Sequence, residues 1–200
     1  MMNTKSTYLP KQLAQKKQWL IFVGLIALML MTRSGLVSHI HDASWAVLFL
    51  VGFYLRHYLG LPLVILTAIG IDFAVIAARG GHQDYYLTPS YLFVIPAYSV
   101  LWFAGRAAAN NYSETIKGFV TFICIAVIGI VACDLLSSGG FYLMSASIQG
   151  LSIGELVSRI SQFTLISLQT TLLYLACAAI VHFVCIQAYK ITNHTNTQNT

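Results

Sequence analysis

One acidic residue, Asp72, stands in the middle of the apolar run ILTAIGIDFAVIAA, where water cannot solvate a carboxylate. A charge at the centre of a membrane-spanning helix costs about 2.5–3.5 kcal/mol on insertion scales. Such a residue must face the interior of a helix bundle, carry a proton, or have a partner. An intramembrane acid often marks a binding or transport site, and the alternative is an ion pair or hydrogen bond that only holds helices together.

The stretch DYYLTPSY at 84–91 gathers three tyrosines and an acid between two apolar runs. Thr88 suits the N-cap of a helix and Pro89 its first position, so this part of the stretch is explained by the start of the next helix. Tyrosines at a membrane surface also form an interfacial aromatic belt. If Tyr91 points inward, however, it joins Asp72 in one cavity, which would suit a large, partly apolar ligand with many amides.

Histidines supply weaker signals. His39, His41 and Asp42 form a polar cluster before the second apolar run, but the cluster lacks the third clear ligand that a metal site needs. His82 follows a Gly-Gly pair, and a solvated loop histidine is the simpler interpretation. His182 lies within the last apolar run and is interpreted as a helix-packing hydrogen-bond partner.

The overall composition indicates the class of protein in which these residues are positioned. The 200 residues are 58% hydrophobic and 8% charged, whereas a soluble domain is about 45–50% apolar and about 25% charged. The sequence therefore predicts an integral membrane protein. The net charge of +5 comes from basic residues at the ends of apolar runs, so it does not indicate nucleic-acid binding. The four cysteines lie within apolar runs without metal-type spacing and are interpreted as small buried hydrophobes.

The fold class that we predict is an all-α bundle of six transmembrane helices. A spanning helix needs about 20 mostly apolar residues, and the candidates are 18–37, 43–59, 61–78, 90–108, 117–136 and 164–188. Residues 1–17 would be a cytoplasmic tail, 18–189 the transmembrane substrate-binding domain, and 190–200 a disordered cytoplasmic tail. The first run lacks a cleavage site and is expected to remain as a helix, with Arg33 near its end snorkelling to the interface. Pro96 predicts a kink or local unwinding.

The basic residues predict the orientation. With the N-terminus in the cytoplasm, the inner segments carry eight of the eleven lysines and arginines and the outer segments carry Arg33, Arg79 and Arg159. This bias, with an even number of spans, places both termini in the cytoplasm.

The predicted outer connections are residues 32–42, 79–89 and 137–163, and they carry more polar and aromatic residues than the short inner connections. The last of these connections has an amphipathic pattern over 153–163. It carries Arg159, which, taken alone, is interpreted as an arginine at the level of the lipid headgroups. We expect the three to fold over the bundle as a lid or mouth. Asp134 and Glu155, also near this face, are read as helix-end acids.

Three stretches resemble the BtuM family of small bacterial membrane proteins: HDASWAVLFLVGFYL, the DYYLTPSY loop with FVIPAYSVLWFAGR, and SSGGFYLMSAS. Members are predicted solitary cobalamin transporters related to the substrate-binding S-components of ECF-type vitamin importers. The resemblance covers about Asp42 to Arg159. It implies an S-component-like fold in a bacterial inner membrane, with a corrinoid bound near the outer face beneath the three outer connections.

The resemblance also implies site residues. An acid in the third helix falls on Asp72, a tyrosine just after the Thr-Pro turn on Tyr91, and an arginine in the last outer connection on Arg159. Tyr85 and Tyr86 would add stacking and hydroxyl contacts. Further candidates for substrate contact are His41, Asp42, Trp45 and Tyr142. Asp72 could accept hydrogen bonds from the ligand or pair with Arg159, and Arg159 could instead hold a phosphate or carbonyl.

The chain departs from the family at Tyr86. A cysteine stands there in the family pattern, and its thiolate ligates the corrinoid cobalt. A phenol, with a pKa of about 10, is a poor substitute for that soft ligand. The protein would therefore bind corrinoid without thiolate ligation, use a histidine such as His82 or His41 as the axial cobalt ligand, or take another substrate. Cys133 is the remaining candidate for a displaced thiol.

The function expected from these observations is transport, not catalysis. Cobalamin or a related corrinoid would be the transported ligand, with no resident cofactor and the lipid bilayer as surroundings. Because the sequence has no Walker motif, energy would come from an ECF module in trans or from trapping downstream. The alternatives are an S-component-like transporter for a different vitamin or base, a histidine-ligated membrane haem protein, and a purely structural membrane subunit.

Overall fold

The computed structural model describes residues 14–35, 40–55, 57–78, 89–113, 115–144 and 153–198. All regular structure in these ranges is helical. In chain order the helices are α1 (Gln15–Arg33), α2 (Ser44–Tyr54), α3 (Gly60–Ala78), the 3₁₀ helix η3 (Pro89–Phe93), α4 (Val94–Asn110), α5 (Ile116–Met144) and α6 (Ile153–Gln198). The predicted all-α fold is thus confirmed for the described residues.

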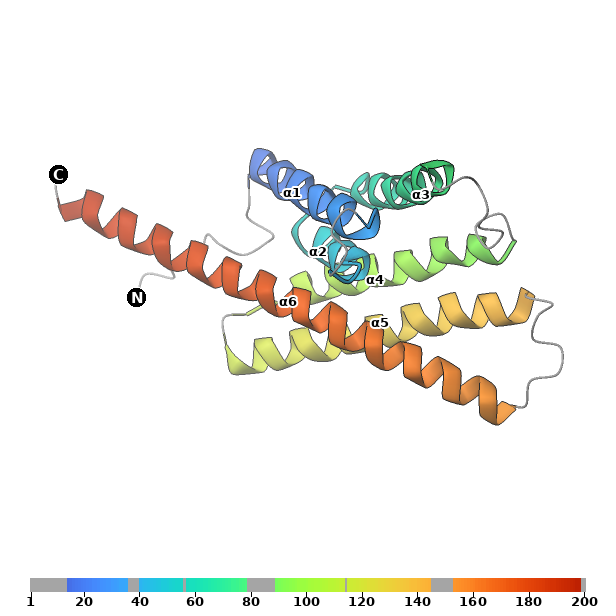
Figure 1. Cartoon of the computed structure of the whole chain (residues 1–200). Helices are drawn as coiled ribbons and strands as arrows, with labels where there is room; N and C mark the ends of the chain where they lie inside the picture. Colours follow the sequence, from blue (N-terminus) through green and yellow to red (C-terminus); the bar gives the residue numbers. More distant parts are fainter. Residues whose placement is uncertain are drawn as a thin grey trace.

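The helices pack in three layers (Figure 1). The middle layer consists of α2 and α4, which contact each other most extensively. On one side of it lie α1 and α3, and on the other α5 packs along α4 with α6 crossing over α5. Ten of the eleven residues of α2 are buried, so this short helix forms the centre of the bundle.

Two glycines explain how closely α2 and α4 approach. A Cβ atom on Gly52 of α2 would collide with the backbone carbonyl of Trp102, and one on Gly105 of α4 would collide with the backbone carbonyl of Phe49. The two backbones are therefore in contact on both sides of the crossing. Small residues allow this approach in membrane proteins, where close packing takes over much of the role of the hydrophobic effect.

Among the described residues, four helical segments are long and apolar enough to cross a membrane: Gly60–Ala78, Pro89–Asn110, Ile116–Tyr142 and Ile160–Cys185. This finding indicates a membrane protein. The spans predicted over 18–37 and 43–59 are not among them, so the prediction of six spans is met for four. The helix predicted over 43–59 is shorter, since α2 covers 11 residues, or about 16 Å at 1.5 Å per residue, against a hydrocarbon core of about 30 Å. The chain becomes extended at Leu55 and turns before α3. Pro62 fits only the first turn of a new helix, so one helix could not run on through this region.

The remaining differences from the sequence prediction concern helix ends. The segment 153–163 is not a separate amphipathic helix but the start of α6, which continues without a break to Gln198. Residues 190–198, predicted to be disordered, are therefore helical, and the red end of α6 extends past the other helices (Figure 1). Pro96 is the third residue of α4, in its first turn, and the 3₁₀ helix η3 ends just before α4 begins; the kink or unwinding predicted at Pro96 itself stays a prediction.

Candidate functional site

A bidentate ion pair joins the end of α1 to the middle of α3. Arg33 donates hydrogen bonds from Nε to Oδ1 of Asp72 and from Nη2 to Oδ2 of Asp72, and both N–O distances are 2.6 Å. The side chains are 13% and 5% exposed. The fork of the guanidinium matches the two carboxylate oxygens, and such pairs are among the strongest hydrogen-bonded contacts in proteins. Asp72 thus meets the predicted requirement for a partner.

The third guanidinium nitrogen of Arg33 connects two further elements. Its Nη1 atom lies 3.0 Å from Oδ2 of Asp42, from the Ser44 hydroxyl at the start of α2, and from the Tyr98 hydroxyl on α4. All three nitrogens of Arg33 therefore donate to protein oxygens. The guanidinium also lies 5.8 Å from the centre of the Tyr98 ring. One side chain holds α1, α2, α3 and α4 together.

Tyr91 completes the group from η3. Its hydroxyl donates a hydrogen bond to Oδ2 of Asp72 at an O–O distance of 2.6 Å, and the residue is 8% exposed. The predicted meeting of Tyr91 and Asp72 inside the bundle is therefore found. We refer to the residues that share these bonds as the Arg33 cluster. Its members are Arg33, Asp42, Ser44, Asp72, Tyr91 and Tyr98.

Local structure explains how the chain brings Asp42 to Arg33. The Asp42 carboxylate accepts hydrogen bonds from the backbone N–H and the hydroxyl of Ser44, the first residue of α2, at 2.9 and 2.6 Å. Thr32 accepts the backbone N–H of Ala43 at 3.1 Å, which ties this turn to the end of α1. Each charge also suits its helix, since an anion is favoured at an N-terminus and a cation in a last turn.

The Arg33 cluster carries a net charge of −1, because one arginine faces two carboxylates. Asp72 is buried, whereas the Asp42 side chain is 43% exposed. The accessible edge of the cluster is therefore a carboxylate with spare capacity to accept hydrogen bonds. Since every nitrogen of Arg33 already donates, the cluster is better suited to a ligand that donates hydrogen bonds than to an anion.

The other predicted site residues lie at varying distances from this cluster. Trp45 packs against the core on α2. His41 has an exposed side chain, and its backbone carbonyl accepts a 2.6 Å hydrogen bond from Tyr174 of α6. Tyr142 lies on α5 in ring contact with its neighbour Phe141, outside the cluster.

Several predicted residues fall outside the described part of the chain. Tyr85, Tyr86 and His82 are in this group. Arg159 lies on α6, but the position of its side chain is outside the description. Asp72 pairs with Arg33 in the structure, and the alternative of a pair between Asp72 and Arg159 stays a prediction.

Arg33 is the main residue that the sequence analysis missed as a site residue. It was predicted to snorkel to the interface, which is wrong, because its side chain is directed into the bundle. Ser44 and Tyr98 were missed as well. A usable signal was depth, because Arg33 and Asp72 both occur in the predicted outer halves of their apolar runs.

Asp134 was predicted to be a solvated acid at a helix end, and the structure corrects this. The residue is 3% exposed on α5. Its carboxylate accepts hydrogen bonds from the Thr164 hydroxyl of α6 and, at 3.2 Å, from the Ser138 hydroxyl. It therefore links α5 to α6 near the end of the bundle that holds the Arg33 cluster.

Among the described residues, no group of three or more histidine, cysteine or acidic side chains is placed to hold a metal ion. Cys133, the candidate displaced thiol, is fully buried in the core. The other three cysteines, Cys124, Cys177 and Cys185, are exposed on the helices, so the prediction of four buried cysteines is correct for Cys133 alone. His182 lies 3.0 Å from the Tyr54 hydroxyl through Nδ1, in line with the helix-packing interpretation.

No protein-family model matches this sequence, and no curated protein matches it. The resemblance to the BtuM family therefore stays a prediction that rests on the quoted stretches.

Proposed function

We propose that the protein is a membrane transporter that binds cobalamin or a related corrinoid from the outer face of a bacterial inner membrane and mediates its uptake. The observation that carries the proposal is the 2.6 Å bond between Tyr91 and Asp72. These are two of the positions that the resemblance assigns to substrate binding, and they meet in a buried cluster rather than facing lipid.

The charge of the Arg33 cluster fits this ligand class. A corrinoid carries several peripheral amides, whose N–H groups donate hydrogen bonds. The exposed carboxylate of Asp42 supplies an acceptor, and hydrogen bonds to charged acceptors are the stronger kind. In this proposal Asp42 contacts the ligand, while Arg33 and Asp72 hold the helices that position it.

Binding would not involve a cobalt thiolate. Tyr86 stands where the family pattern has a cysteine, and the buried Cys133 lies within the core of the bundle. The same substitution supports the second candidate, an S-component-like transporter for a different vitamin or base. In either case energy would come from a partner module or from trapping of the ligand, since the sequence has no nucleotide-binding motif.

Calorimetric titration of the purified full-length protein with cobalamin and with cobinamide, followed in parallel by absorbance, tests the proposal. We expect binding without a change in the cobalt spectrum. Asp42→Asn should lower the affinity about tenfold, the equivalent of about 1.4 kcal/mol. Glu155→Gln, which neutralises an exposed carboxylate on α6, serves as the matched control and should bind as the unmodified protein does.

Each other outcome has a clear meaning. A spectral change on binding would indicate an axial protein ligand and contradict the cobalt part of the proposal. Absence of binding to both compounds, in protein that unfolds cooperatively, would reject corrinoid as the substrate and favour the second candidate. Equal affinity of Asp42→Asn and the unmodified protein would remove Asp42 from the site.

A further inference from the structure

The described helices line a partly open cavity of about 430 Å³ at the end of the bundle opposite the Arg33 cluster. Its walls come from the C-terminal part of α2, the α4–α5 connection, the start of α5 and the second half of α6. The two sites are separated by α2, which begins at Ser44 in the cluster and ends at Tyr54 in the cavity wall, about 16 Å along the helix. The volume lies within the range of about 300–1,000 Å³ typical of small-molecule sites.

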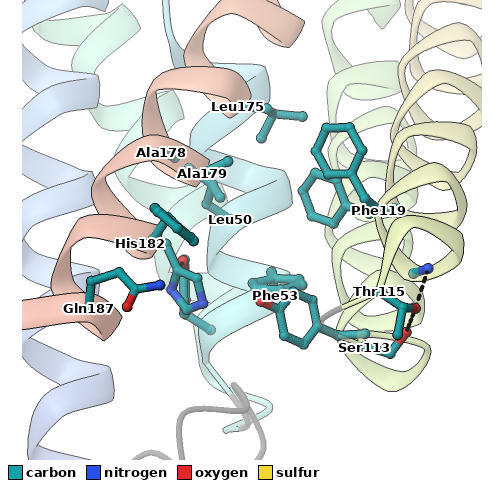
Figure 2. Close-up of a pocket in the computed structure, with 15 residues that line it drawn as sticks. Leu50, Phe53, Ser113, Thr115, Phe119, Leu175, Ala178, Ala179, His182 and Gln187 are labelled. Carbon is teal, nitrogen blue, oxygen red and sulfur yellow. Dashed lines mark hydrogen bonds between the residues drawn. The ribbon is translucent and has the colours of Figure 1, made fainter. Parts of the chain in front are cut away.

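Polarity changes in the same direction along all three helices that line the cavity (Figure 2). On α2 the lining runs from Leu50 to Tyr54, and on α6 from Leu175 to Gln187. On α5 it runs from Phe122 back to the connection at Thr115. The deep end is thus apolar, and the end at the α4–α5 connection offers hydroxyl, imidazole and amide groups.

Aromatic rings form much of the wall and support one another. Phe53 meets the rings of Phe122 and Tyr112 edge to face, with centroids 5.5 and 5.7 Å apart. Tyr112 meets His182 at 6.0 Å, and the Tyr54 hydroxyl lies 3.0 Å from Nδ1 of His182. Rings linked in this way have few accessible rotamers, so the wall is preorganised for a flat ligand.

The charge of the wall limits the ligand further. The described residues that line the cavity include no lysine, arginine, aspartate or glutamate. None of the described lining residues could therefore act as a counter-ion for a charged group, and burying a charge without one is costly in apolar surroundings. Ala178 and Ala179 keep one side of the cavity open.

We propose that this cavity is a second ligand site, which binds a neutral, flat, lipid-soluble ring compound with a hydrogen-bond-accepting carbonyl oxygen on its edge, the chemistry of a quinone. The ring would lie between the phenylalanines, and one of its carbonyl oxygens would face the Tyr54–His182 pair. An apolar substituent would extend toward Leu175. This site is independent of the corrinoid proposal, since it shares no residue with the Arg33 cluster.

Equilibrium binding of menadione to the full-length protein in lipid nanodiscs tests the site. We expect saturable binding of one molecule per chain. Ala178→Phe fills the cavity and should weaken binding at least tenfold. Ala176→Phe adds the same side chain two positions away on α6, at an exposed position outside the cavity, and should leave binding within twofold of the unmodified protein. Thermal unfolding of both variants checks that they are folded.

A second variant and a competitor make the test independent of packing effects. Tyr54→Phe removes a hydroxyl but no ring, and should weaken menadione binding several-fold without loss of stoichiometry. A saturated monoacylglycerol should compete poorly. If it displaces menadione with similar affinity, the cavity holds an acyl chain and the proposal for a ring compound is wrong. Unchanged affinity in Ala178→Phe would overturn the site itself.

Discussion

Arg33 and Asp72 lie 39 residues apart in the sequence and form a two-point ion pair, with both N–O distances 2.6 Å. The pair is buried, and the remaining guanidinium nitrogen reaches Asp42, Ser44 and Tyr98. Removing one partner would leave a buried charge without compensation, whereas removing both would leave only the Asp42 carboxylate, whose side chain is 43% exposed. The pair is therefore the first place to separate structural from functional roles.

Arg33→Met should destabilise the protein by about 3–5 kcal/mol, because it leaves Asp72 as a buried charge without its partner. Asp72→Asn should destabilise the protein by a similar amount, because it leaves Arg33 as a buried charge without its main partner. The double variant Arg33→Met/Asp72→Asn should recover a large part of the loss, since replacing both charges of a buried pair is often nearly neutral. Denaturant unfolding in detergent micelles of the four proteins measures the coupling.

Additive losses in this cycle would contradict the interpretation of the pair as a unit. Ligand binding by the double variant gives separate information. If the double variant is stable but does not bind corrinoid, the pair contributes to the site beyond holding the helices.

Tyr91→Phe removes the hydroxyl that donates to Asp72 over 2.6 Å. A hydrogen bond to a charged group contributes about 1.5–3 kcal/mol, so the free energy of unfolding should fall by about that amount. The matched control is Tyr58→Phe, because Tyr58 is 73% exposed in the α2–α3 connection. Chemical denaturation of both variants is the measurement, and equal stability of the two would show that the Tyr91 hydroxyl contributes nothing.

The sequence predicted part of this site for a clear physical reason. An acid in an apolar run is costly without a partner, and a tyrosine just inside the next helix has a hydroxyl that can serve as one, and Asp72 and Tyr91 do meet. The partner of Asp72 could not be predicted in the same way. Arg33 lies close enough to the end of its run for a long side chain to reach the interface, so hydropathy allows two positions for it.

The helix lengths show a similar limit. Hydropathy of the segment 43–59 is equally compatible with a full spanning helix and with a short, enclosed one, and the structure has the short α2. The polar tail after Tyr189 has the composition of a disordered segment, yet α6 continues through it. Composition describes a segment by itself, whereas contacts and helix continuation depend on what lies beside it and before it.

The crossing of α2 and α4 predicts a strong effect of a single methyl group. Gly105→Ala should force the two backbones apart, because the new Cβ collides with the carbonyl of Phe49. Overpacking typically costs about 1–3 kcal/mol, and here the obstacle is backbone rather than a movable side chain. Gly52→Ala should destabilise the protein in the same way, because its new Cβ collides with the backbone carbonyl of Trp102. Thermal unfolding measures both.

Gly70→Ala provides the control for helix propensity. A Cβ on Gly70 of α3 would meet no atom within 4 Å, so this variant should be as stable as the unmodified protein or more so. A loss in Gly70→Ala equal to that in Gly105→Ala would mean that the close approach of α2 and α4 is not the cause.

Cysteine labelling in intact cells tests the predicted orientation and the path of the short α2. In a background with the four native cysteines changed to alanine, Ile40→Cys and Tyr58→Cys place thiols before and after α2, at residues that are 48% and 73% exposed. A membrane-impermeant maleimide should label Ile40→Cys directly and Tyr58→Cys only after permeabilisation, because eight of the eleven basic residues lie on the predicted inner side. The reverse pattern would invert the topology. Labelling of both from outside would mean that the segment between them does not cross the membrane.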